Sequence, residues 1–113
     1  MERIDNRQNN EMRSIKMTPG FISSADGSVL IEMGNTRVIC NATRLPEVPG
    51  WLKGRGTRWV TAEYSLLPQS TNKRVDRERK GASGRTQEIQ RLIGRSLRGA
   101  ADLAALGENA IVV

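Results

Sequence analysis

Polar and apolar residues alternate along two neighbouring runs, residues 28–33 and 36–43. Successive side chains of a strand point to opposite faces, so this alternation predicts strands with one apolar face each. Only Gly34 and Asn35 separate the runs, and a two-residue link of this type favours a β-hairpin with glycine at positive φ. The residues expected to share the apolar strand faces are Val29, Ile31 and Met33, and Val38, Cys40 and Ala42.

Three more segments have the composition of strands. Residues 58–67 are rich in aromatic and β-branched side chains and end before Pro68, and residues 109–113 begin another apolar run. Residues 13–17 alternate weakly, and the Thr-Pro-Gly step at 18–20 either ends this strand or bends a longer one. We expect a strand in each segment.

The remaining connections are polar or rich in glycine and proline. Residues 1–11 have no apolar period and are expected to form a flexible arm. Residues 45–56 contain two prolines and three glycines, which predicts a loop. Residues 69–83 are polar and basic, which predicts a mobile surface loop.

One segment has the apolar period of an amphipathic helix. Apolar and small residues recur at steps of three and four and form one stripe: Ile89, Leu92, Ile93, Ser96, Leu97, Ala100, Ala101 and Ala104. Arg91, Arg95 and Arg98 lie off this stripe, and we interpret them as the solvated face of the helix. Gly107 is the expected helix stop.

The charge of the chain is concentrated in one stretch. Residues 73–98 hold nine Lys and Arg against three acids, an excess of +6 that equals the net charge of the whole chain. This stretch leads into the predicted helix, where free backbone N–H groups and the helix dipole both favour anions. Concentrated positive charge favours a polyanionic partner, with nucleic acid first, over a soluble basic domain without one.

The single cysteine and the absence of histidine exclude a disulfide framework and a Cys/His metal cluster. Cys40 lies in an apolar run and is predicted to be a buried structural thiol. The first residues lack the apolar region of a secretion signal, and no stretch is apolar enough to span a membrane, so we expect a cytoplasmic protein. No pair of carboxylates stands out as a metal site, and Trp51 and Trp59 are expected to pack rather than stack on bases.

Three consecutive residues are candidates for binding a phosphate. Gly84 allows close approach to the backbone, Arg85 offers a planar fork with two hydrogen bonds, and Thr86 can cap the helix or donate a hydroxyl. The alternative is a loop whose arginine faces water, and the tripeptide alone does not decide between them.

The preceding loop offers cations that can hold RNA phosphates. The alternative is a solvated surface that Asp76 and Glu78 partly neutralise, and composition slightly favours it. The four cations are Arg74, Arg77, Arg79 and Lys80.

Three motifs in this order resemble the N-terminal half of ribonuclease PH: GSVLIEMGNTRVIC, then WLKGRGTRWVTAEYSLLPQST, then RVDRERKGASGRTQEIQRLIGRSLR. The resemblance runs from about Arg3 to Val113. It implies an α/β fold of the ribosomal-protein-S5-domain-2-like kind, with a mixed sheet packed by a long helix. It also implies that residues 1–113 are the N-terminal part of such a domain, so that the fold is incomplete and the chain stops within it.

The family resemblance implies a function as well. Such enzymes trim the 3′ end of transfer RNA precursors by letting inorganic phosphate attack the terminal phosphodiester, which releases nucleoside diphosphates, and they assemble as hexameric rings. Arg85 matches the arginine that helps to bind the attacking phosphate, and Arg74 and Arg77 match arginines that grip the transfer RNA. The family uses Mg²⁺, whose carboxylate ligands we expect outside this chain.

One residue departs from the family pattern. Gln69 stands where the family usually has a third RNA-gripping arginine, which should weaken transfer RNA binding. Because the catalytic carboxylates are also expected elsewhere, the isolated chain is expected to be inactive. The alternative is a non-catalytic RNA-binding or ring-building half-domain.

Overall fold

The computed structural model describes residues 2–105 and 107–113, so the position of Met1 in the expected N-terminal arm lies outside the described residues. The chain divides into two compact units, Met1–Ala42 and Thr43–Val113. Strand β3 contributes residues to both of them. No helix within the described ranges is long and apolar enough to cross a membrane.

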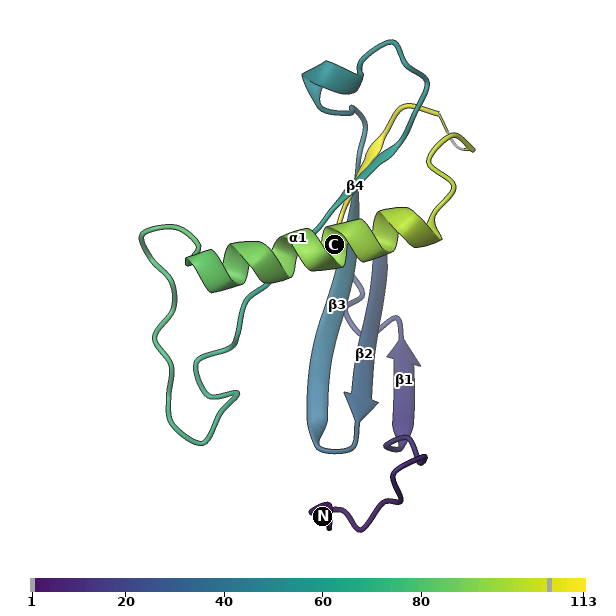
Figure 1. The fold of residues 1–113 in the computed structure, drawn as a ribbon. Coiled ribbons are helices and arrows are strands. Elements are labelled where there is room, and N and C mark those ends of the chain that lie inside the picture. The colour runs from purple at the N-terminus through teal and green to yellow at the C-terminus, as the bar shows by residue number, and fades with distance from the viewer. Residues whose placement is uncertain (1, 106) are drawn as a thin grey trace. The chain divides into compact units, whose positions relative to one another are not determined.

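The first unit is built on three antiparallel strands. They are β1 (Ile15–Pro19), β2 (Gly27–Met33) and β3 (Thr36–Leu45), with β2 between the other two (Figure 1). The predicted hairpin is confirmed: Met33 pairs with Thr36, and Gly34 takes a φ of +60° that a glycine adopts without strain. The weakly alternating strand starts two residues later than predicted and includes Pro19, which an edge strand tolerates.

The register places one set of apolar side chains on a common face of this three-stranded sheet. Met17 lies opposite Ile31, and Ile31 lies opposite Val38. The prediction that Cys40 is buried is wrong, because its side chain is exposed. The described residues of this unit form no helix, so the unit provides no second layer to cover that face.

The second unit contains a small mixed sheet. Strand β5 (Ala110–Val112) pairs antiparallel with the end of β3 and parallel with β4 (Trp59–Thr61), and a short 3₁₀ helix, Gly50–Leu52, lies between β3 and β4. The strand predicted over residues 58–67 is therefore confirmed only for its first part. Just beyond it, the backbone N–H of Glu63 still donates to the Val113 oxygen at 2.8 Å, but the N–H of the next residue, Tyr64, donates to Oε1 of Gln90 at 3.1 Å.

The predicted helix is α1 (Gly84–Ala100), which packs against β4 in the second unit (Figure 1). It ends earlier than expected, because Gly107 lies beyond it in a separate turn at a φ of +75°. The carboxylate of Asp102 accepts a hydrogen bond from the backbone N–H of Ala104 at 3.1 Å. A local bond of this kind offers the backbone an alternative to continued helix.

The buried face of α1 is rotated from the predicted stripe. Leu92 belongs to the predicted stripe but is 61% exposed. Gly94 lies off that stripe and is one of the buried residues of α1. A Cβ at position 94 would lie 2.9 Å from Nη1 of Arg98 and 3.8 Å from the backbone nitrogen of Ala62. The glycine therefore leaves room for the Arg98 guanidinium, whereas the Ala62 backbone would be at ordinary van der Waals distance. The buried apolar residues described in the second unit are Val48, Leu52, Val60, Ala62 and Ala110.

Arg98 is part of this packing, so its assignment to the solvated face is wrong. Its guanidinium donates to the backbone oxygen of Val60 at 2.8 Å and lies 4.5 Å from the centre of the Trp59 ring. Trp51 meets Trp59 edge to face at 4.8 Å, which agrees with the predicted packing role. Arg91 and Arg95 are exposed, as predicted.

We expect Arg98→Met to lower the free energy of unfolding by about 2 kcal/mol. Methionine keeps much of the apolar stem, but it removes the cation–π contact and leaves the Val60 oxygen without its donor. Urea unfolding followed by tryptophan fluorescence measures the change. Arg95→Met removes the same charge from the exposed side of α1 and should change stability by less than about 0.5 kcal/mol. Equal losses in the two variants would contradict the packing role of Arg98.

Candidate anion-binding site

The first turn of α1 leaves two backbone donors free. The Ser83 hydroxyl caps the helix by accepting from the Thr86 N–H at 3.2 Å, and the Ser83 carbonyl accepts from the Gln87 N–H at 2.9 Å. The N–H groups of Gly84 and Arg85 have no hydrogen-bond partner in the described part of the chain. With the helix dipole behind them, these two groups favour an anion at this point.

Arg85 adds a side chain to this turn. It is exposed, and its guanidinium forms no ion pair with any residue between 2 and 105 or 107 and 113. A Cβ at Gly84 would meet no atom within 4 Å, so the backbone before Arg85 is open to a ligand. The two N–H groups and a guanidinium on one turn can together hold a phosphate.

Thr86 belongs to the same turn, but unlike Arg85 it is buried. Only 9% of the residue is exposed, and its hydroxyl donates to Oε1 of Glu78 at 2.8 Å. The cap predicted as one possible role of Thr86 is supplied instead by Ser83. A direct contact between the Thr86 hydroxyl and a phosphate stays a prediction, because the hydroxyl proton is already shared with Glu78.

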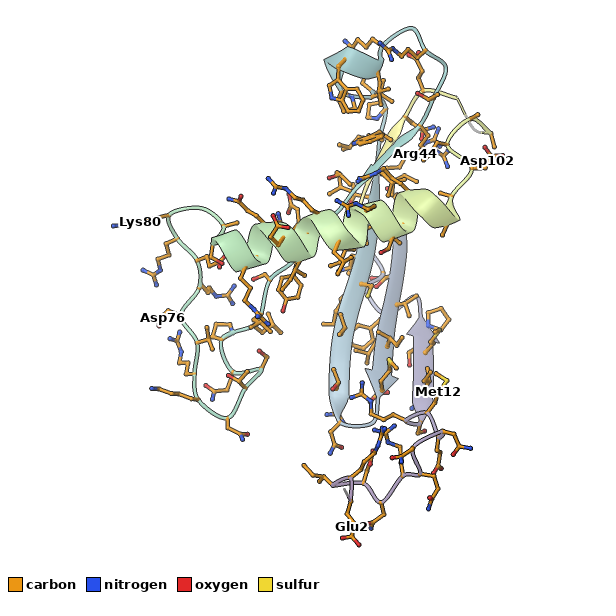
Figure 2. All side chains as sticks on the ribbon, viewed as in Figure 1. Glu2, Met12, Arg44, Asp76, Lys80 and Asp102 are labelled. Atoms are coloured by element: carbon orange, nitrogen blue, oxygen red, sulfur yellow. The ribbon has the colours of Figure 1, made fainter. Side chains whose placement is uncertain are left out.

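The basic loop, residues 69–83, lies between β4 and α1, directly before the helix, and contains no helix or strand. Figure 2 shows Asp76 and Lys80 on its outer side, with Lys80 extended away from α1. A hollow of about 630 Å³ lies along it and ends at the cap of the helix. The residues that line this hollow are Arg74, Asp76, Arg77, Glu78, Arg79, Lys80, Gly81 and Ser83.

Neutralisation within the loop is partial. Nη1 of Arg74 donates to Asp76 at 2.8 Å, which is the self-neutralising pattern. Arg77, Arg79 and Lys80 form no ion pair with any other described residue. The four cations and two carboxylates of the hollow leave a charge of +2 beside the first turn of α1. The alternative interpretation, a solvated surface neutralised by its own acids, therefore fits Arg74 better than it fits Arg77, Arg79 and Lys80.

Glu78 is the one acid of the loop that contacts α1 among the described residues. The hydrogen bond from the Thr86 hydroxyl, followed by those from Ser83, holds the pKa of the Glu78 carboxyl below its ordinary value of 4.5. Glu78 is therefore ionised at neutral pH. No sequence pattern indicated this contact, whereas a serine before a helical period could have identified the Ser83 cap.

Two further sequence expectations concern the exposed arginines of α1 and a metal site. Arg91 pairs with Glu88 at 2.6 Å, one turn apart on the exposed side of α1. No three Cys, His, Asp or Glu side chains converge as a metal site within the described ranges.

The contact between Glu78 and Thr86 predicts a pH dependence. A lowered pKa in the folded chain means that the contact is formed at neutral pH and is lost as the pH falls through that lowered value. We expect the Glu78 carboxyl to titrate below 4.5 in the wild-type chain and to return towards 4.5 in Thr86→Val, measured by carbon-13 NMR. Thr86→Ser keeps the hydroxyl and is the control. An unchanged midpoint in Thr86→Val would contradict the hydrogen bond.

Comparison with known proteins gives a consistent result. Residues 11–113 match the model of the 3′ exoribonuclease family, domain 1 (RNase_PH). Ribonuclease PH of Dehalococcoides mccartyi strain 195 is 56% identical over the whole chain, and that of Syntrophomonas wolfei is 58% identical over 98% of it. The chain spans 48% and 47% of the lengths of these two relatives, which is about half.

Solved structures agree on the fold. Rice Rrp46 superimposes with a TM-score of 0.76 at 16% identity, covering 97% of this chain and 48% of that one. An Archaeoglobus fulgidus exosome with RNA bound to the active site gives a TM-score of 0.71 at 26% identity, over 98% and 45% of the two chains. The expected mixed sheet with a long helix, of the ribosomal-protein-S5-domain-2-like kind, is thereby confirmed. With most of its length matched by the family model, the chain belongs to the RNase_PH 3′ exoribonuclease family.

Proposed function

We propose that this chain supplies the phosphate-binding and RNA-binding elements of a phosphate-dependent 3′-to-5′ exoribonuclease that trims transfer RNA precursors. The observation that carries the proposal is the first turn of α1, which offers two free backbone N–H groups and also carries the Arg85 side chain. The membership of the chain in a 3′ exoribonuclease family gives this anion site its reaction class.

The reaction would consume inorganic phosphate as a co-substrate. An oxygen of phosphate attacks the phosphorus of the last phosphodiester, and the bond from that phosphorus to the 3′ oxygen of the preceding nucleotide breaks. The proton of the attacking phosphate passes to that 3′ oxygen, and the last nucleotide leaves as a nucleoside diphosphate. The difficulty is to bring two anions together, and a guanidinium beside free N–H groups reduces their repulsion.

The basic loop would hold the RNA strand that leads to this reaction. Arg77, Arg79 and Lys80 have no acidic partner among the described side chains, so their charges are available for RNA phosphates. Contacts of this kind position a backbone and do not read sequence. Arg74, which is paired with Asp76, would exchange that partner for a phosphate on binding.

The remaining parts of the site would come from outside this chain. The described side chains gather no carboxylate cluster for Mg²⁺, and the relatives are about twice as long as the chain. We therefore propose that metal ligands and further phosphate contacts are supplied by polypeptide corresponding to the rest of the relatives. Assembly into a ring belongs to the same proposal, and the similarity to an archaeal exosome core, with a TM-score of 0.63, supports it.

The test of the proposal combines binding with product analysis. We expect Arg85→Ala to weaken binding of inorganic phosphate at least about tenfold, because it removes charge-assisted hydrogen bonds. Arg77→Ala should weaken binding of a transfer RNA with extra 3′ nucleotides and reduce the slope of its salt dependence by about 1. Calorimetry and fluorescence anisotropy measure the two affinities. Arg95→Ala, an exposed cation elsewhere on α1, is the matched control and should leave both nearly unchanged.

The product identifies the reaction class. When polypeptide corresponding to the rest of the relatives and Mg²⁺ are both present, labelled inorganic phosphate should enter nucleoside diphosphates as the RNA is shortened, and the signal should fall in Arg85→Ala. Nucleoside monophosphates formed without phosphate would contradict phosphorolysis. RNA binding that depends on Arg77, with no phosphate binding at all, would leave the chain as an RNA-gripping element alone.

A further inference from the structure

We infer that Glu78 is a positioning residue, which accepts a hydrogen bond from the Thr86 hydroxyl and thereby holds the basic loop, with Arg77 and Arg79, beside the first turn of α1 that carries Arg85. The inference rests on the proposed function of that turn. It assigns a role to an acid in a segment that otherwise gathers positive charge.

Few contacts hold the middle of the basic loop. Near its start, the Val75 N–H donates to the Pro68 oxygen at 2.8 Å, and near its end, the side-chain amide of Gln87 donates to the Ala82 oxygen at 3.1 Å. Between these two anchors, the bond from Thr86 to Glu78 at 2.8 Å is the only hydrogen bond between α1 and the described residues 76–81. Without it, the stretch that carries most of the cations has no tie to the helix.

The position of this bond in the sequence matters. Glu78 stands between Arg77 and Arg79, and consecutive Cα atoms are only about 3.8 Å apart. On the helix side, Thr86 directly follows Arg85. One hydrogen bond therefore joins two points of the chain that are each adjacent to the cations proposed to bind phosphate.

The two ends of the bond suit this role. Thr86 is held on α1 and only 9% exposed, and the Ser83 and Thr86 hydroxyls lie 3.1 Å apart. Glu78 is ionised at neutral pH, because these hydroxyls lower the pKa of its carboxyl. A hydrogen bond to a charged acceptor is stronger than one between neutral groups. A carboxylate beside an anion site would by itself repel the ligand. The hydrogen bonds that hold Glu78 there are therefore best explained by a positioning role.

The first test measures the order of the loop without reference to activity. Trypsin cleaves after arginine and lysine, so cleavage after Arg77 and Arg79 reports how often the loop is released from α1. We expect Thr86→Val to speed this cleavage roughly three- to tenfold, since it removes the donor and leaves the loop sequence intact. Thr86→Ser retains the hydroxyl and should behave as wild type. Unchanged cleavage in Thr86→Val would overturn the inference.

The second test measures affinity for inorganic phosphate and for a single-stranded RNA. Thr86→Val and Glu78→Ala should each weaken phosphate binding by a similar factor of about three to ten, and the double variant should be no worse than either one. Glu78→Gln keeps an oxygen acceptor and should recover part of the affinity. Asp76→Asn removes the same charge from the same loop without touching α1, and it should not weaken binding.

The outcomes separate the two proposals. Tighter phosphate binding in Glu78→Ala would show that Glu78 competes with the ligand instead of positioning the loop, and it would overturn the inference. Additive losses in the double variant would do the same. A wild-type chain that binds neither phosphate nor RNA would refute the proposed function, whereas wild-type binding with unchanged Thr86→Val would refute only the role of Glu78.

Discussion

The close approach of α1 to β4 is the contact on which the second unit depends. Glycine at position 94 leaves room for the Arg98 side chain at this contact, because a Cβ there would lie 2.9 Å from Nη1 of Arg98. The Arg98 guanidinium then spans the gap, with the Val60 carbonyl on one side and the Trp59 ring against it. A helix held in this way has a fixed position and a fixed first turn, and the candidate site is built on that turn.

The chemistry of the site follows from how this turn is capped. A helix begins with four backbone N–H groups that lack partners within the helix. The chain satisfies Thr86 through the Ser83 hydroxyl and Gln87 through the Ser83 carbonyl, and it leaves Gly84 and Arg85 open. Because Ser83 occupies only the N–H groups of Thr86 and Gln87, residues 83–87 both end the basic loop and present two free N–H donors to an anion. A turn whose four N–H groups all had partners would present no free donor to an anion.

Local sequence predicted most of the elements, and tertiary contacts decided where they end. The hairpin was predictable because the alternation and the Gly34 turn agree with each other. The segment after Thr61 has strand composition, but its backbone bonds to the neighbouring strand segment only as far as Glu63, and the Tyr64 N–H donates to the Gln90 side chain. The helical period of the sequence could not reveal that the Arg98 guanidinium contacts the Trp59 ring, because a cation–π contact depends on residues distant in the chain. Cys40 was misplaced because an apolar run indicates a face and not what covers it.

The candidate site shows the same division. Gly84 and Arg85 could be predicted from a basic loop that precedes a helical period, because the anion preference of a helix start is a local property. The role of Glu78 could not, because its partner is eight residues away through a loop without regular structure. In the sequence it is one of two acids that dilute a basic segment, and the two are equivalent by charge. Only the structure separates them: Asp76 neutralises Arg74 at the surface, whereas Glu78 ties the loop to the helix. The arrangement of charge, more than its sum, therefore determines which cations remain available to a phosphate.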